Sequence, residues 1–245
     1  MSIRRYLDKI DFNKFQLFIK SRFKAQRGQS LVELALVFPV LLIMIAGLVE
    51  IGFYFYSYMT AVELTREAAR YASQRKINAL DAPSSGLPDT ACNDGDFHYY
   101  FDTACVILDK GFNTYLEFDE AVDDITISVL TVSNNVITNR WPNDADGVWS
   151  LASASDGWSG SENWKKDCEG NVVLSQPFFT NSEIQAKFLG GAPTSRGLMI
   201  VEIYYCYEQV LNLPVLSDYI DNPLRIHAYT IMPVFDAEPT PTPIP

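Results

Sequence analysis

A glycine and, five residues later, a glutamate stand at the start of a long apolar run, and their types and spacing suit a processing and assembly site. Gly28 is followed by Gln29, and Glu33 precedes the uncharged residues 34–49. Glycine lacks a Cβ, so an enzyme can approach the backbone closely and hold it extended. Gly28 is therefore a candidate cleavage point. Cleavage would free the α-amino group of Gln29, and Glu33 of a neighbouring subunit could pair with that cation, because an unpaired charge beside hydrocarbon is strongly unfavourable.

A second interpretation of the same residues involves no cleavage. In it, Gly28 ends an amphipathic helix in the cytoplasm, and Glu33 lies among the lipid headgroups. Both interpretations are open from the residues alone. They differ in whether residues 1–28 stay on the mature protein and in whether Glu33 pairs with another subunit.

The apolar run predicts a single membrane-spanning helix. Residues 34–49 carry no charge, and residues 51–58 extend the run with several aromatic side chains. Together they cover roughly 25 residues, enough for a hydrocarbon core about 30 Å thick, and the aromatics suit its outer interface. A removable secretory signal is disfavoured, because its apolar stretch is shorter and small residues follow it. We expect the helix to continue to about Lys76, with Pro39 kinking or loosening it.

Beyond the apolar run, small residues recur at helical spacing. They are Ala61, Thr65, Ala68 and Ala72. Small residues allow close packing, either with neighbouring helices in a filament or against a sheet of the same chain. We favour the contact with the sheet.

Charge is unevenly distributed and indicates an orientation. The chain carries a net −11 and residues 1–28 carry +6, so the remainder carries −17. A basic segment before an apolar helix predicts a cytoplasmic N-terminus and an extracytoplasmic body. The acidic body argues against a nucleic-acid partner, because phosphate binding needs clustered cations.

All four cysteines lie in the acidic body. An even number of cysteines in an exported domain favours disulfides. Three pairings are possible, and proximity in the chain favours Cys92–Cys105 and Cys168–Cys206; free buried thiols are the alternative. Zinc is disfavoured, since no C-x-x-C spacing occurs.

The body has strand patterns that follow the helix. Three strong β-branched or alternating runs cover residues 125–132, 198–210 and 224–235, and residues 172–174 form a weaker one. Turn-forming residues dominate 78–96. A helix followed by strands predicts an α+β fold, in which a long N-terminal transmembrane helix continues into a pilin-like antiparallel sheet domain.

Two segments of the body have unusual compositions. Residues 141–170 are polar yet contain all four tryptophans, so this loop either presents a binding surface or folds back over the sheet. Residues 237–245 alternate proline with other residues and are expected to be an extended, disordered segment.

Catalysis is not indicated. A hydrolase needs a nucleophile, a base and an orienting group, whereas His98 and His227 are isolated and His227 lies within a predicted strand. Asp123 and Asp124 are expected to be solvated turn acids, and residues 143–147 lack two ligands of a calcium loop. We expect no enzyme activity, no cofactor and no metal site.

Residues 27–73 resemble the TadE-like family of pilus assembly proteins, which are pseudopilins of the tight-adherence (Flp-type) secretion system. The resemblance rests on three segments, which are residues 28–33 (GQSLVE), 47–52 (GLVEIG) and 66–72 (REAARYA). It implies cleavage by a prepilin peptidase between Gly28 and Gln29, with Glu33 at the fifth position of the mature protein.

The resemblance also implies a function and a set of partners. The chain would be a minor pilin or pseudopilin that assembles with other Tad pilins and pseudopilins in the cytoplasmic membrane or the pilus. Four parts are then expected: a basic leader (1–28), a transmembrane and continuing helix (29–76), an extracytoplasmic α+β domain (77–236) with a loop insertion (141–170), and the Pro/Thr segment (237–245). The alternative is a membrane-anchored surface adhesin, whose binding module is the tryptophan-bearing loop.

Overall fold

The computed structural model describes most of the chain, namely residues 12–75, 98–111, 116–134, 136–142, 147–154, 161–187, 195–212 and 220–234. Cys92, Trp158, the predicted loop at 78–96 and the Pro/Thr segment 237–245 lie outside these ranges. The chain divides into two compact units, Met1–Ile51 and Gly52–Pro245, and each is described by itself.

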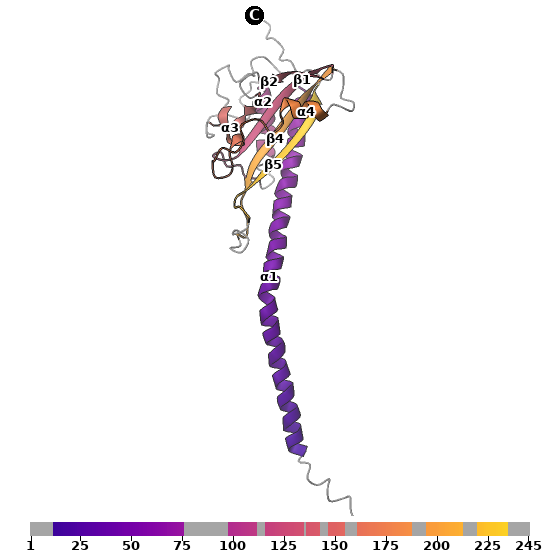
Figure 1. The fold of residues 1–245 in the computed structure, drawn as a ribbon, viewed down its shortest axis with the longest axis vertical. Coiled ribbons are helices and arrows are strands. Elements are labelled where there is room, and N and C mark those ends of the chain that lie inside the picture. The colour runs from indigo at the N-terminus through magenta and orange to yellow at the C-terminus, as the bar shows by residue number, and fades with distance from the viewer. Residues whose placement is uncertain are drawn as a thin grey trace, which may run out of the picture. The chain divides into compact units, whose positions relative to one another are not determined.

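One helix, α1 (Phe12–Ser73), accounts for the described part of the first unit and continues into the second (Figure 1). It starts well before the predicted residue 29 and runs through Gly28 without a break. A helix end at Gly28 was therefore wrong, whereas the other parts of that interpretation, an uncut chain and Glu33 among the headgroups, stay predictions. Pro39 lies inside α1, where it removes one backbone donor.

The second unit is built on an antiparallel sheet whose strand order is β2-β1-β4-β5, with β3 also paired to β1. The strands are β1 (Asp124–Ser133), β2 (Val136–Trp141), β3 (Trp149–Ser150), β4 (Ser195–Tyr207) and β5 (Leu224–Val234). Strands β1, β4 and β5 confirm the three strong sequence patterns. The weak pattern at 172–174 makes only an isolated bridge between Val172 and Lys166.

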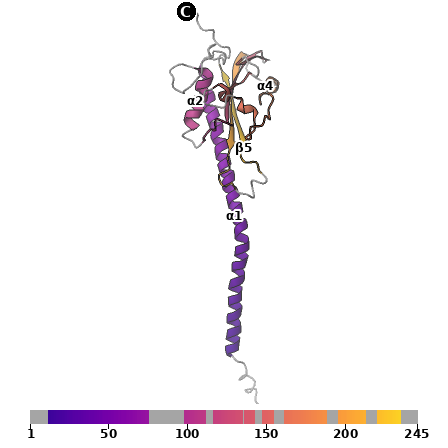
Figure 2. The same cartoon turned by 90° about the vertical axis from the view of Figure 1, so that its left-hand side faces the viewer.

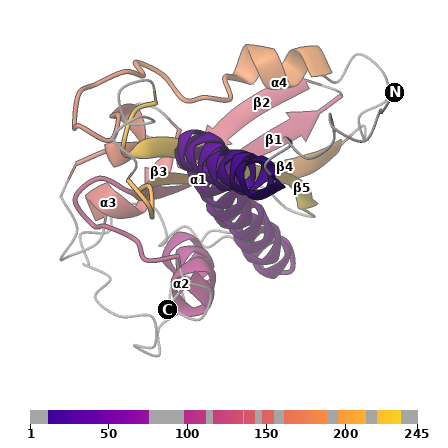
Figure 3. The same ribbon diagram turned by 90° about the horizontal axis from the view of Figure 1, so that it is seen from below.

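Helices cover both faces of this sheet. The last turns of α1 and the helix α2 (Tyr99–Gly111) lie on one face, and α4 (Asn181–Lys187) lies on the other (Figures 2 and 3). The first face buries alternate residues of the strands, such as Ile127 and Val201, while Leu130 and Ile200 pack with Ile184 of α4 on the second. The predicted α+β class is confirmed.

The small-residue stripe of α1 packs against the sheet, as the sequence favoured. Ala61, Thr65, Ala68 and Ala72 are fully buried, and α1 carries its exposed charges on the opposite side, including Glu63, Arg66 and Arg70. Leu64 and Ala69 are buried in the same cluster as these small residues, together with Ile127 and Val201 of the sheet.

Between β2 and α4 the chain passes over the sheet through short elements. They are β3, α3 (Leu151–Ala154) and a 3₁₀ helix (Asn163–Lys165). Trp149 and Trp164 are buried, at 5% and 1% exposure. These two tryptophans therefore belong to the core, as expected if the segment folds back over the sheet.

Candidate functional site

The exposed apolar surface of α1 is the most distinctive feature of the first unit. Large apolar side chains from Leu31 to Ile51 are almost all exposed, at values between 43% and 73%. Among the residues that the structure describes, α1 is the one helix long and apolar enough to cross a membrane. A soluble protein rarely exposes a contiguous apolar surface of this extent, so this part of α1 is a candidate membrane-spanning segment.

Glu33 lies on this exposed part of α1, between Val32 and Leu34, which are 61% and 60% exposed. Gln29 lies four residues before Glu33 in the sequence, and α1 runs through both positions. If the chain were cut after Gly28, the helix would start at Gln29. Glu33 would then lie near a helix N-terminus, where the helix dipole favours a negative charge.

Gly28 lies inside α1, so a peptidase must open the helix to reach its peptide bond. Glycine in a helix interior costs about 1 kcal/mol relative to alanine, which makes Gly28 a local weak point. The structure places Gly28, Gln29 and Glu33 on one continuous helix, whereas the sequence analysis assigned Gly28 to a separate leader. Whether the bond is cut remains a prediction.

Two further glycines lie on α1 within its apolar surface, at Gly47 and Gly52. A Cβ added at either position would meet no atom of the chain within 4 Å. Contacts among the described residues therefore do not require glycine at these positions, although each glycine weakens the helix.

The sequence was compared with models of known protein families. The model of the TadE-like protein family matches residues 28–70, which lie on α1. Residues 28–70 are a TadE-like domain. The domain starts at Gly28, contains Glu33, Gly47 and Gly52, and ends within the sheet-facing part of α1. TadE-like proteins are generally non-enzymatic structural proteins, which agrees with the expectation of no enzyme activity. No curated protein and no solved structure matches the chain.

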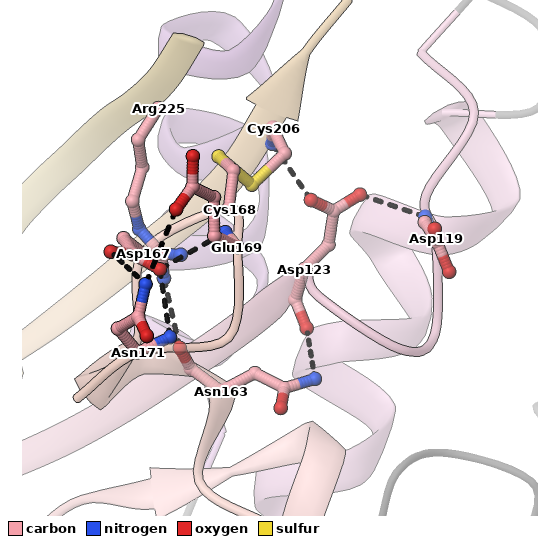
Figure 4. The surroundings of a disulfide bond; sticks show 9 residues. All are labelled: Asp119, Asp123, Asn163, Asp167, Cys168, Glu169, Asn171, Cys206 and Arg225. Carbon is pink, nitrogen blue, oxygen red and sulfur yellow. Dashed lines mark hydrogen bonds between the residues drawn. A yellow bond between two sulfur atoms is a disulfide. The ribbon is translucent and has the colours of Figure 1, made fainter. Parts of the chain in front are cut away.

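The part of the second unit that follows α1 is called the body below. It contains a polar cluster around a disulfide (Figure 4). Cys168 and Cys206 are bonded, which confirms that predicted pair. Cys105 is buried in α2, whereas Cys92 lies outside the described residues, so the pair Cys92–Cys105 stays a prediction. The disulfide links the segment after the 3₁₀ helix to the end of β4.

Asp123 lies directly behind this disulfide and is only 1% exposed. Its carboxylate accepts the backbone N–H of Cys206 at 2.7 Å and that of Asp119 at 2.7 Å. Its backbone oxygen accepts the side-chain amide of Asn163 at 3.2 Å. Burial raises the pKa of Asp123 to about 7, partly offset by the two backbone donors.

Asp124, the next residue, belongs to the same cluster and is fully buried. Its carboxylate accepts the Ser150 hydroxyl at 2.7 Å and the backbone N–H groups of Trp164 and Ala152 at 3.0 and 3.1 Å. Burial raises its pKa to about 6. The expectation of solvated turn acids was wrong for both aspartates, because the segment carrying Asn163 and Trp164 folds over them.

A second polar group lies on the same face of the sheet, between β4 and β5. His227 Nε2 lies 2.8 Å from Glu202 Oε2, which also accepts the Tyr204 hydroxyl at 3.0 Å. The rings of Phe178 and Tyr204 flank the imidazole, with centroids at 4.3 and 4.5 Å. Glu202 is only 2% exposed, and its printed partners are Tyr204 and His227 of the same layer.

The central carboxylates of these clusters, Asp123, Asp124 and Glu202, are buried and hydrogen-bonded within the body. His227 lies in β5, as the sequence indicates, and its pairing with Glu202 was missed because it depends on the β4–β5 register. Within the described ranges no three metal-ligating side chains come together. The predicted calcium-like stretch at 143–147 lies mostly outside those ranges. The functional residues of this chain are thus best sought on α1.

Proposed function

We propose that the chain is a pseudopilin or minor pilin that takes part in assembling a Tad pilus. The observation that carries the proposal is the coincidence of the TadE-like domain with the exposed apolar surface of α1. The domain match points to Tad pilus assembly, and an exposed apolar helix is what a membrane-anchored subunit needs before it joins its neighbours.

In this proposal α1 spans the cytoplasmic membrane once. Residues 1–28 lie in the cytoplasm, because they carry a net +6 and positive residues are retained on that side. The body lies outside, where the disulfide between Cys168 and Cys206 can form and persist. The same arrangement places Gly28 at the cytoplasmic end of the membrane-spanning segment.

A prepilin peptidase then cuts between Gly28 and Gln29. The cut removes the basic leader and creates an α-amino group at the start of the mature helix. Removing the net +6 of the leader also lowers the electrostatic barrier to withdrawing the helix end from the cytoplasmic side. Processing therefore converts an anchored precursor into a subunit that can leave the membrane.

Assembly places Glu33 of one subunit against the α-amino group of Gln29 of another. A charge pair in an apolar setting has a strong orientation preference, because leaving either charge unpaired costs several kcal/mol, about 3–5. Gly47 and Gly52 provide open positions where a neighbouring helix can approach α1 closely. The other partners are further Tad pilins and pseudopilins.

The alternative of a membrane-anchored adhesin is less well supported. It rested on exposed tryptophans in residues 141–170, and Trp149 and Trp164 are buried in the core. The polar clusters beside them also serve the packing of the body. We therefore retain the assembly role as the proposed function.

Substitution of Glu33 tests this proposal in cells that make the pilus. Glu33→Ala should leave membrane insertion intact, since it removes a charge from an apolar helix, but should strongly reduce incorporation into pili. Glu33→Asp is the matched control, because it keeps the carboxylate and should retain part of the assembly. Fractionation measures insertion and immunodetection on sheared pili measures incorporation. Normal incorporation of Glu33→Ala would refute the charge pairing.

A further inference from the structure

Three exposed apolar side chains lie where β4 has ended and β5 has not yet started. Val210 and Leu211 follow β4 and are 59% and 41% exposed, and Ile220 precedes β5 and is 44% exposed. We call Val210, Leu211 and Ile220 the hairpin surface. Large aliphatic side chains are the ones that proteins most often bury, so an exposed group of them marks a candidate contact with an apolar partner.

Hydrogen bonds between the two sides of the hairpin hold this surface in place. The backbone N–H of Gln209 donates to Asn222 Oδ1 at 3.0 Å, and Asn222 Nδ2 donates to Asn212 Oδ1 at 3.2 Å. Residues on both flanks of Val210 and Leu211 are thus bonded to the segment that follows Ile220. The amide groups of this region bond to one another, whereas its apolar side chains face outward.

Contacts with α1 show where the hairpin surface lies along that helix. The rings of Tyr54 and Tyr207 are in contact, with centroids at 5.7 Å, and Tyr207 pairs with Leu224 at the start of β5. Further along both elements, Thr65 of α1 contacts Thr230 of β5, so α1 and β5 run in the same direction. The chain that follows β4 and precedes β5 therefore extends past Tyr54, towards the lower-numbered residues of α1 (Figure 1).

The same part of α1 has the composition of a membrane interface. Between 40% and 56% of each of four aromatic side chains is exposed, namely Phe53, Phe55, Tyr56 and Tyr58. These residues belong to the compact unit that contains the sheet. Aromatic side chains gather where the hydrocarbon core of a bilayer meets the headgroups. The hairpin surface is therefore continuous with the part of a candidate membrane-spanning helix that suits this boundary.

We propose that the hairpin surface docks onto the extracytoplasmic surface of the bilayer that α1 crosses. This inference rests on the membrane anchoring in the proposed function. Val210, Leu211 and Ile220 enter the boundary between headgroups and acyl chains, while Glu208 and Asp221 stay among the hydrated headgroups. The body is then held at two points, the helix and the hairpin, which restricts its tilt and presents the same face to each incoming subunit.

The charges around the hairpin surface identify what drives the docking. Residues 207–223 contain no Lys, Arg or His, and they include the acids Glu208, Asp218 and Asp221. Attraction to anionic lipids needs basic residues, so the burial of apolar side chains must drive the docking. A bilayer of phosphatidylcholine, whose headgroup has no net charge, should therefore be sufficient, and added salt should not release the hairpin.

Quenching of tryptophan fluorescence by nitroxide-labelled lipids tests the docking. The full chain is reconstituted with one copy per phosphatidylcholine nanodisc. Leu211→Trp places a reporter in the hairpin surface. Val136→Trp is the matched control, because Val136 is 54% exposed but lies at the opposite end of the sheet. The emission of each variant is compared with that of the unmodified chain, whose four tryptophans contribute equally to both.

Lipids labelled near the headgroup should quench at least about half of the emission that Leu211→Trp adds, because interfacial side chains lie roughly 5–10 Å into the boundary. Ile220→Trp should behave in the same way, so the result does not depend on one substitution. The emission added by Val136→Trp should be unchanged, and salt should alter none of these results. Unquenched emission from both hairpin variants would overturn the proposal, as would equal quenching of the control or quenching that salt abolishes. Quenching that requires several copies per disc would overturn the assignment to lipid in favour of another subunit.

A further variant separates failure of the docking from failure of the proposed function. Met44 is 65% exposed on the apolar part of α1, so lipids labelled deep in the acyl chains should quench the emission that Met44→Trp adds. Quenched Met44→Trp together with unquenched Leu211→Trp would overturn the docking and leave the membrane anchoring intact. Unquenched Met44→Trp would overturn the anchoring and the docking together.

Discussion

Thr65 of α1 and Thr230 of β5 share a hydrogen bond of 2.9 Å between their Oγ1 atoms. Thr65 Oγ1 also lies 2.8 Å from the backbone oxygen of Val62, one turn earlier in the helix. This contact joins the end of the TadE-like domain to the edge strand of the sheet. The last turns of α1 are thus part of the body's core, while the earlier turns carry the exposed apolar surface.

The contact between α1 and the sheet should not tolerate larger side chains. Ala68 is fully buried there, so Ala68→Leu should destabilise the body by about 1–3 kcal/mol through overpacking. Arg70→Leu introduces the same side chain at an exposed position and should change stability by less than about 0.5 kcal/mol. Urea unfolding of the full chain in detergent measures both. Equal stability of the two variants would mean that α1 does not pack as described.

The disulfide should contribute substantially to the stability of the body. Cys168 and Cys206 are 38 residues apart, and closing a loop of that size restricts the unfolded chain by about 4 kcal/mol. Replacing both residues by serine should lower the free energy of unfolding by roughly 2–4 kcal/mol. Chemical reduction of the unmodified protein should produce a similar loss. A double serine variant as stable as the unmodified protein would contradict this account of the segment after the 3₁₀ helix.

The buried aspartates should make the body less stable as pH rises. The pKa values of Asp123 and Asp124 are raised from 3.8 to about 7 and about 6. The folded state therefore binds these protons more tightly than the unfolded state. Their stabilising contribution is complete below about pH 4 and is lost as pH rises through about 6 to 7, at roughly 1.4 kcal/mol per pKa unit.

Asp123→Asn tests the origin of this dependence. The amide oxygen can accept one of the two backbone N–H groups, so the variant should be less stable at acidic pH, but its stability should vary less between pH 4 and 7. Asp221→Asn, at an exposed position, should keep the original dependence. Denaturant unfolding across this pH range measures both variants. An unaltered pH dependence in Asp123→Asn would show that another group is responsible.

The glycines of α1 should matter for assembly and not for folding. A Cβ at Gly47 or Gly52 meets no atom within 4 Å in the described part of the chain, so Gly47→Leu and Gly52→Leu should leave insertion and the stability of the body unchanged. Incorporation into pili should fall, because the larger side chain holds a neighbouring helix away. Phe38→Leu, at an exposed position of the same helix, is the control. Normal incorporation of both glycine variants would contradict the proposed helix contact.

Sequence patterns predict the elements of this fold better than its polar contacts. The runs that became β1, β4 and β5 are dense in β-branched and aromatic residues, and the small-residue stripe of α1 indicates close packing. β2 was missed because Thr138, Asn139 and Arg140 make it polar, which suits its exposed edge position. α2 was missed as well, although it places Tyr99 and Ile107 in the core.

The polar clusters could not be predicted because they depend on contacts between distant residues. Asp123 and Asp124 look like turn acids in the sequence, and only the segment held by Cys168–Cys206 buries them. The pairing of Glu202 with His227 requires the register of β4 against β5, which no local pattern specifies. Gly28 and Glu33 are candidates on a local pattern alone, since both stand beside one long apolar run, and their roles stay predictions.

The central claim is that the chain is processed after Gly28 before it assembles. Intact-mass measurement and N-terminal sequencing of protein isolated from pili test it most directly. The account predicts a mature chain that begins at Gln29 and lacks residues 1–28. Assembled protein that still carries the leader would contradict the account.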